Sequence, residues 1–134
     1  MQELETQLRN DLSKIGLDVE FNLSLRKYSK SYYGRYDVVT STIIVYVHKN
    51  PNGDMYSYED ILLTTIHEAI HCKQWHDPNY KRLRGVMHDT EFKRLYALYS
   101  NRARARILLR KVINYDSFYK ACGREVYDNI GVRC

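Results

Sequence analysis

The stretch TTIHEAIHCKQWHD, residues 64–77, places three histidines close together and a glutamate directly after the first of them. On a helix that turns about 100° per residue, His67 and His71 lie one turn apart on one face, so their imidazoles can share a metal ion. Glu68 lies beside that face, where it can reach a metal-bound water without displacing it. The apolar residues form a separate arc suited to a core, namely Leu62, Ile66, Ala69 and Ile70. This H-E-x-x-H stretch therefore predicts a zinc site on a packed helix.

A catalytic zinc ion takes three protein ligands and keeps one position open for water, so a third ligand is needed. His76 is one candidate, but the metzincin pattern H-E-x-x-H-x-x-G-x-x-H-D needs a glycine where Gln74 stands, and on a continued helix His76 faces away from the metal. Glu91 is a second candidate, since gluzincins take a glutamate from a following helix. His88, at the start of that same following helix, can reach back over the first helix and would complete a set of three neutral histidines. We favour His88.

The segment before this helix is expected to contain a helix and two strands. Apolar residues recur every three or four positions over residues 4–15, which predicts an amphipathic helix that ends at Gly16. Segment 19–26 alternates between apolar and polar residues and predicts a strand. Gly34 is a turn candidate. Segment 40–50 is β-branched and aromatic, and it predicts the strongest strand, which stops at the turn sequence NPNGD.

Capping residues predict where the helices begin and end. Ser57 can cap the H-E-x-x-H helix, with Asp60 three residues later in a variant of the capping box, and the pair Asp77-Pro78 stops it. A second helix can start at Asp89 or Thr90. It is expected to run through the following basic segment, either whole or broken near residues 100–101.

Length and composition favour one ordinary globular domain over residues 1–134. Of its residues, 44% are hydrophobic and 28% charged, and no apolar run is long enough to span a membrane. The three cysteines are odd in number and form no CxxC pair, which argues against a disulfide framework or a zinc ribbon. We therefore expect a cytoplasmic protein in a reducing compartment.

With these residues in view, the chain resembles SprT-like (Spartan-type) zinc metalloprotease domains. The resemblance rests on HEAIH at 67–71 followed by HDTEFKRL at 88–95, where members typically read H-E-x-x-H and then H-G-x-x-[FW] with basic residues after it. GRYD…TSTIIVYV is also similar to the family's glycine-containing turn leading into a strand. The resemblance covers roughly residues 34–95. Asp89 departs from the usual glycine, and the four-cysteine zinc ribbon of many bacterial members has no counterpart here.

This resemblance implies a zincin-like α+β fold, with a small N-terminal helix and a β-sheet packed on the H-E-x-x-H helix and further helices after it. It also implies hydrolysis of peptide bonds, and for several members cleavage of proteins bound or crosslinked to DNA. The predicted mechanism uses one Zn²⁺ held by His67, His71 and His88, with Glu68 as the general base that activates a water. Segment 43–47 is a candidate edge strand on which a peptide substrate could pair, or else a plain core strand.

Positive charge gathers after the histidine cluster and suggests a second partner. The formal net charge is +5, and residues 72–111 carry 11 Lys and Arg against 3 Asp and Glu. On a helix Arg102, Arg106 and Arg110 form one ridge, so the basic surface of residues 81–111 is a candidate DNA-binding surface or a solvated helix face. The alternative function is therefore a nucleic-acid- or protein-binding module with a structural or decayed metal site.

Overall fold

The computed structural model describes the backbone of residues 2–80 and 87–122, and side chains as far as residue 113. The elements are α1 (Gln2–Lys14), β1 (Asn22–Arg26), β2 (Gly34–Asp37), β3 (Thr42–Tyr46), α2 (Tyr58–His76) and α3 (Thr90–Cys122). An N-terminal helix, a three-stranded mixed sheet and two further helices make an α+β protein, as predicted. Contacts between Cα atoms group the chain into two compact units, Met1–Ala103 and Arg104–Cys134. The expected single domain stays a prediction.

The first helix, α1, ends where the sequence predicts. Gly16 has a φ of 85°, a left-handed conformation that glycine adopts without strain. The amide of Leu17 donates to the carbonyl of Leu12, and that of Gly16 to Ser13, which is the Schellman pattern of helix termination. Leu8 and Leu12 are buried on the inner face of the helix.

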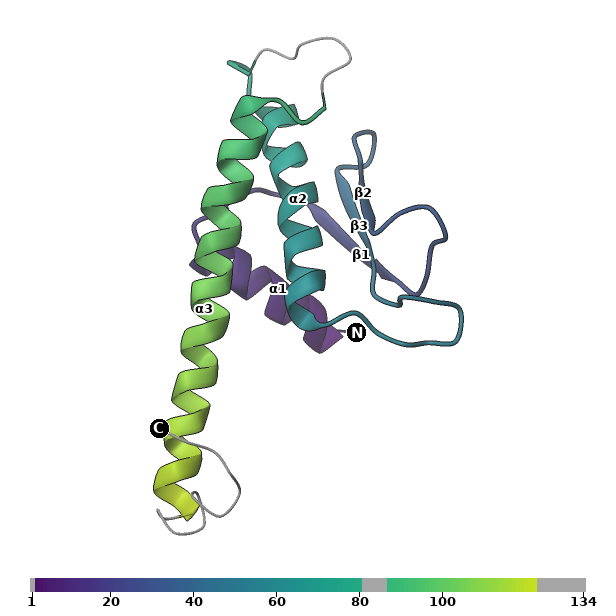
Figure 1. The fold of residues 1–134 in the computed structure, drawn as a ribbon. Helices are drawn as coiled ribbons and strands as arrows, with labels where there is room; N and C mark the ends of the chain where they lie inside the picture. The colour runs from purple at the N-terminus through teal and green to yellow at the C-terminus, as the bar shows by residue number, and fades with distance from the viewer. Residues whose placement is uncertain (1, 81–86, 123–134) are drawn as a thin grey trace. The chain divides into compact units, whose positions relative to one another are not determined.

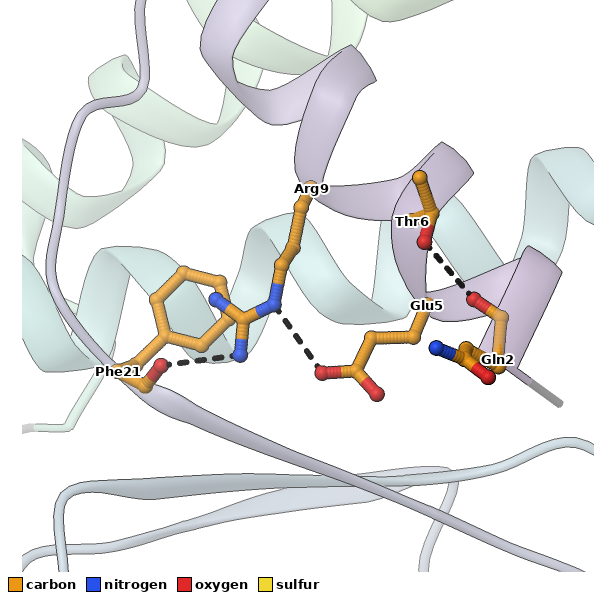
Figure 2. A network of polar contacts seen from close by, with 5 residues as sticks. All are labelled: Gln2, Glu5, Thr6, Arg9 and Phe21. Carbon is orange, nitrogen blue, oxygen red and sulfur yellow. Dashed lines mark hydrogen bonds and ion pairs between the residues drawn. The ribbon is translucent and has the colours of Figure 1, made fainter.

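Arg9 of α1 fastens the helix to the segment that leads into β1. Its Nε donates to Glu5 Oε1 at 3.2 Å and one Nη to the carbonyl of Phe21 at 3.2 Å (Figure 2). The guanidinium also lies 4.9 Å from the centroid of the Phe21 ring. Thr6 Oγ1 donates to the carbonyl of Gln2 within the same helix (Figure 2). These contacts fix the position of the segment that connects α1 to β1.

The sheet has the strand order β1-β3-β2, so β3 is central. It pairs in parallel with β1, where Asn22 faces Thr42, and antiparallel with β2, where Gly34 faces Val45. Because neighbours cover both of its edges, β3 is not available to a peptide, and the edge-strand interpretation of segment 43–47 is wrong. Its continuous apolar run, with Ile43, Ile44 and Val45 all buried, is typical of a strand covered on both faces. Gly34 begins β2 and is not a turn residue.

The second helix, α2, supplies much of the core. Ser57 is the N-cap, and its side chain accepts a hydrogen bond from the amide of Asp60, as the sequence predicts. The predicted apolar arc, with Leu62, Ile66, Ala69 and Ile70, is fully buried. Within the first unit, α2 lies between the sheet and the N-terminal part of α3 (Figure 1). His67 and His71 of α2 contact Phe92 near the start of α3.

The third helix, α3, is unbroken over Thr90–Cys122. Of the two alternatives, the whole helix is confirmed and the break near residues 100–101 is wrong. The helix accommodates Ser100, whose Oγ donates to the carbonyl of Ala97. None of the helices in the described part of the chain combines the length and apolar composition needed to cross a membrane.

Candidate metal centre

The helix α2 presents His67 and His71 toward the start of α3, where Phe92 contacts both rings. Both side chains are half-buried, while the neighbouring apolar arc is anchored in the core. The two rings lie one helical turn apart, with centroids separated by 5.0 Å. Because the opposite face of α2 is fixed by burial, these imidazoles have a defined direction relative to the core.

His88 is placed by the start of α3. The next residue, Asp89, caps the helix: its Oδ1 accepts from the amide of Phe92 at 2.8 Å, and its carbonyl accepts from the amide of Lys93. The hydroxyl of Tyr80 donates to the other carboxylate oxygen of Asp89. The hydrogen bond from Tyr80, and next that from the Phe92 amide, lower the pKa of Asp89. Asp89 thus fixes the backbone beside His88 where the SprT-like pattern has glycine.

The three histidines bring one nitrogen each to a common point. His88 Nε2 lies 3.1 Å from His67 Nε2 and 3.1 Å from His71 Nε2. Bonds of about 2.0–2.1 Å to a tetrahedral zinc would place two ligand nitrogens roughly 3.3–3.4 Å apart. His67, His71 and His88 therefore form a group that could hold a metal ion.

Hydrogen bonding alone gives a poor account of this cluster. A ring nitrogen carries either one hydrogen or one lone pair, so His88 Nε2 cannot make two good hydrogen bonds to His67 and His71 together. A cation shared by three lone pairs satisfies all of them at once. Burial, and next the charge of His88, lower the pKa of His67, which favours the neutral imidazole that binds metals.

Phe92 is the aromatic support of the cluster, a role that the sequence reasoning missed. Its buried ring lies 4.5 Å from the His71 ring, in a stacked arrangement, and 4.8 Å from each of His67 and His88. Tyr96, one turn further along α3, extends this aromatic layer, and its ring centroid lies 5.9 Å from that of His67. The signal was available in the sequence: Phe92 and Tyr96 follow His88 at intervals of four residues, on the same helix face.

Glu68 lies beside the histidines and is only 7% exposed. Burial raises the pKa of its carboxyl to about 7, because removing a carboxylate from water disfavours the charged form. Strand β2 packs directly against this part of α2. A Cβ built on Gly34 would lie 2.7 Å from Thr64 Cγ2, 2.9 Å from the Ile44 carbonyl and 3.5 Å from Glu68 Cγ. Only glycine lets the strand approach so closely.

Two hollows open on either side of His67 and Glu68. One, of about 380 Å³, is lined by both of these and by His71, His88, Trp75, Met87 and other side chains. The other, of about 590 Å³, has five tyrosines among its lining residues. Both hollows also share Tyr32 and Gly34, the first residue of β2.

The two rejected ligand candidates make other contacts. His76 Nε2 lies 3.0 Å from the hydroxyl of Tyr36 and 3.3 Å from Ser41 Oγ. Glu91 binds Arg94 at 2.6 Å on the exposed side of α3. Neither belongs to the histidine group found among the described residues.

Arg102, the first arginine of the predicted ridge, has a structural contact. Its Nη1 donates to the carbonyl of Ile15 at 2.9 Å, just past the end of α1, and its guanidinium lies 5.6 Å from the Tyr99 ring centroid. Arg106 and Arg110 belong to the second compact unit and are half-buried. The basic residues of segment 81–86 lie outside the described residues.

The chain matches no protein-family model, no curated protein and no solved structure.

Proposed function

We propose that this protein is a zinc-dependent endopeptidase of the zincin type. The observation that carries the proposal is the convergence of His67, His71 and His88 on one point beside the buried Glu68. Three neutral histidines with a neighbouring carboxylate are the ligand and base set of zinc hydrolases. The resemblance to SprT-like domains supports the proposal, because its two motifs, HEAIH and HDTEF, contain the three proposed ligands and Phe92.

Each residue has a role in this reaction. His67, His71 and His88 would hold the zinc ion, which when bound polarises the scissile carbonyl and makes a water more acidic. The Glu68 carboxylate takes the proton of the attacking water and delivers it to the leaving amine. Phe92 and the core face of α2 fix the direction of the imidazoles. The hollows on both sides of Glu68 would hold the residues of the substrate before and after the cleaved bond.

The outer edge of β2 is our candidate for positioning the substrate backbone. Among the described strands, β2 pairs only with β3 and is an edge of the sheet. It approaches α2 at Gly34, next to Glu68, and both hollows border it. An extended peptide paired with this edge would pass in front of the histidines.

Replacement of Glu68 by glutamine is the direct test. Glu68→Gln should retain zinc but lower hydrolysis of an unfolded protein substrate by at least about 100-fold, because glutamine cannot take the proton. The measurements are zinc content per chain and cleavage rate after reconstitution. Glu59→Gln, which removes an exposed carboxylate from the same helix, is the matched control and should keep both. Undiminished cleavage by the Glu68 variant would remove this residue from the mechanism.

A basic binding module with a structural or decayed metal site is the alternative. This alternative predicts that the zinc-loaded protein does not hydrolyse peptide bonds. DNA as a partner stays a prediction. Arg102 of the ridge contacts the end of α1, and Arg106 and Arg110 are half-buried.

A further inference from the structure

The larger hollow beside the metal centre has an aromatic wall. Tyr32, Tyr33, Tyr46, Tyr56 and Tyr96 all line it. The rings of Tyr33 and Tyr56 meet edge to face with centroids 5.7 Å apart, and Tyr33 is 68% exposed. Exposed tyrosine faces carry partial negative charge and attract cations.

The charged groups of this hollow are all acidic. Apart from Glu68, the only charged side chain among its described lining residues is Asp60, in the first turn of α2. Asp60 is close enough that its charge contributes to the raised pKa of Tyr56, after burial and the neighbouring Tyr33 and Tyr28. The smaller hollow differs, since Arg35 lines it. Asp60 in one hollow and Arg35 in the other therefore make the hollow beside Asp60 the more favourable of the two for a cation.

We propose that this hollow is a subsite for a lysine or arginine side chain of the substrate, with Asp60 as the residue that selects it. The inference rests on the proposed peptidase function and adds the chemical class of substrate. The aliphatic stem of such a side chain packs on the tyrosine rings, and its charged head is paired with Asp60. A cation–π contact and a solvent-exposed ion pair together correspond to a preference of about tenfold.

Binding to an inactive variant tests the subsite independently of catalysis. Zinc-loaded Glu68→Gln protein is titrated into two fluorescein-labelled decapeptides of alanine, glycine and serine that differ in one central residue, arginine or glutamine. We expect the arginine peptide to bind about tenfold more tightly. Adding Asp60→Asn should reduce this preference to less than about threefold.

Glu59→Gln, added in place of Asp60→Asn, is the matched control. It removes the same charge from the same helical turn, but Glu59 does not line the hollow. The preference for arginine should survive it. The cap of α2 is intact in both variants, because Ser57 bonds the backbone amide of Asp60 and not its carboxylate. Equal binding of the two peptides, or a preference that Asp60→Asn leaves unchanged, overturns the inference.

Cleavage mapping distinguishes failure of the subsite from failure of the proposed function. The zinc-reconstituted native chain digests an unfolded protein, and the products are sequenced by mass spectrometry. Lysine and arginine should be enriched at one fixed position relative to the cleaved bond, and Asp60→Asn should abolish that enrichment. Cleavage without this enrichment of lysine and arginine overturns the proposed subsite. Complete lack of cleavage overturns the peptidase function, while the peptide titrations still decide the subsite.

Discussion

At the scale of single residues, Glu68 combines burial with a position beside the histidines. Its pKa of about 7 in the folded protein exceeds the ordinary value of 4.5 because the carboxyl is removed from water. Between these pH values the folded state binds more protons than the unfolded state, so the free energy of unfolding falls as pH rises. The group therefore favours folding in acid and opposes it above neutral pH.

This linkage predicts a pH-dependent effect of Glu68→Gln in metal-free protein. At pH 8 the variant should be more stable than the native chain by roughly 2–3 kcal/mol, and near pH 4.5 the difference should vanish. Urea unfolding with a chelator present, at several pH values, measures it. Identical pH dependence of the two proteins would mean that Glu68 is well solvated when the metal is absent.

The third ligand of the proposed zinc site can also be tested by single substitutions. His88→Ala should remove most of the bound zinc, because two histidines leave the metal underligated. The Glu91→Ala variant should keep one zinc ion per chain, since Glu91 forms an ion pair with Arg94 and lies outside the histidine group. Zinc content after dialysis measures both. Full retention by His88→Ala together with loss by Glu91→Ala would exchange the roles of the two residues.

At the scale of elements, the contact between β2 and α2 determines how the sheet meets the metal centre. Gly34 leaves no room for a methyl group, with Thr64 Cγ2 and the Ile44 carbonyl both under 3.0 Å from a Cβ placed there. Gly34→Ala should lower the free energy of unfolding by about 1–3 kcal/mol, since one of the two neighbours is backbone. Urea unfolding measures the loss.

A second substitution tests the cause of that loss. Thr64→Ser deletes the nearer methyl, so the double variant should be less destabilised than the sum of the two single variants. Additive losses would show that the side chain of Thr64 is not what resists the added methyl.

At the scale of the whole molecule, the core and the candidate metal centre use different faces of α2. The core of the first unit is built from apolar side chains of α1, β3, α2 and the N-terminal part of α3, while His67 and His71 lie on the other face of α2. Chelation should therefore abolish hydrolysis, lower the melting temperature and leave most of the helical circular dichroism at 25 °C. Free zinc at about 1,000 times its Kd should raise the free energy of unfolding by about 4 kcal/mol relative to the metal-free protein. Unfolding on chelation would instead support a structural metal site.

Much of the helical structure was determined by the sequence itself. The start and end of α2, the end of α1 at Gly16 and the direction of His67 and His71 follow from residues within a few positions of one another. Caps and helical faces depend on such local geometry, and their spacing is visible in the sequence. The choice of His88 as the candidate third ligand also followed from its place at the start of a capped helix.

Only the tertiary structure decided the order of the strands and the surroundings of the site. The central place of β3, the close approach of Gly34 to α2 and the contacts of Phe92 with His67 and His71 join segments far apart in the chain. Local pattern does not specify which strand becomes an edge, because pairing depends on non-local hydrogen bonds and on the surfaces that remain to be buried. For the same reason, the tyrosines and Asp60 line one hollow only after the chain has folded.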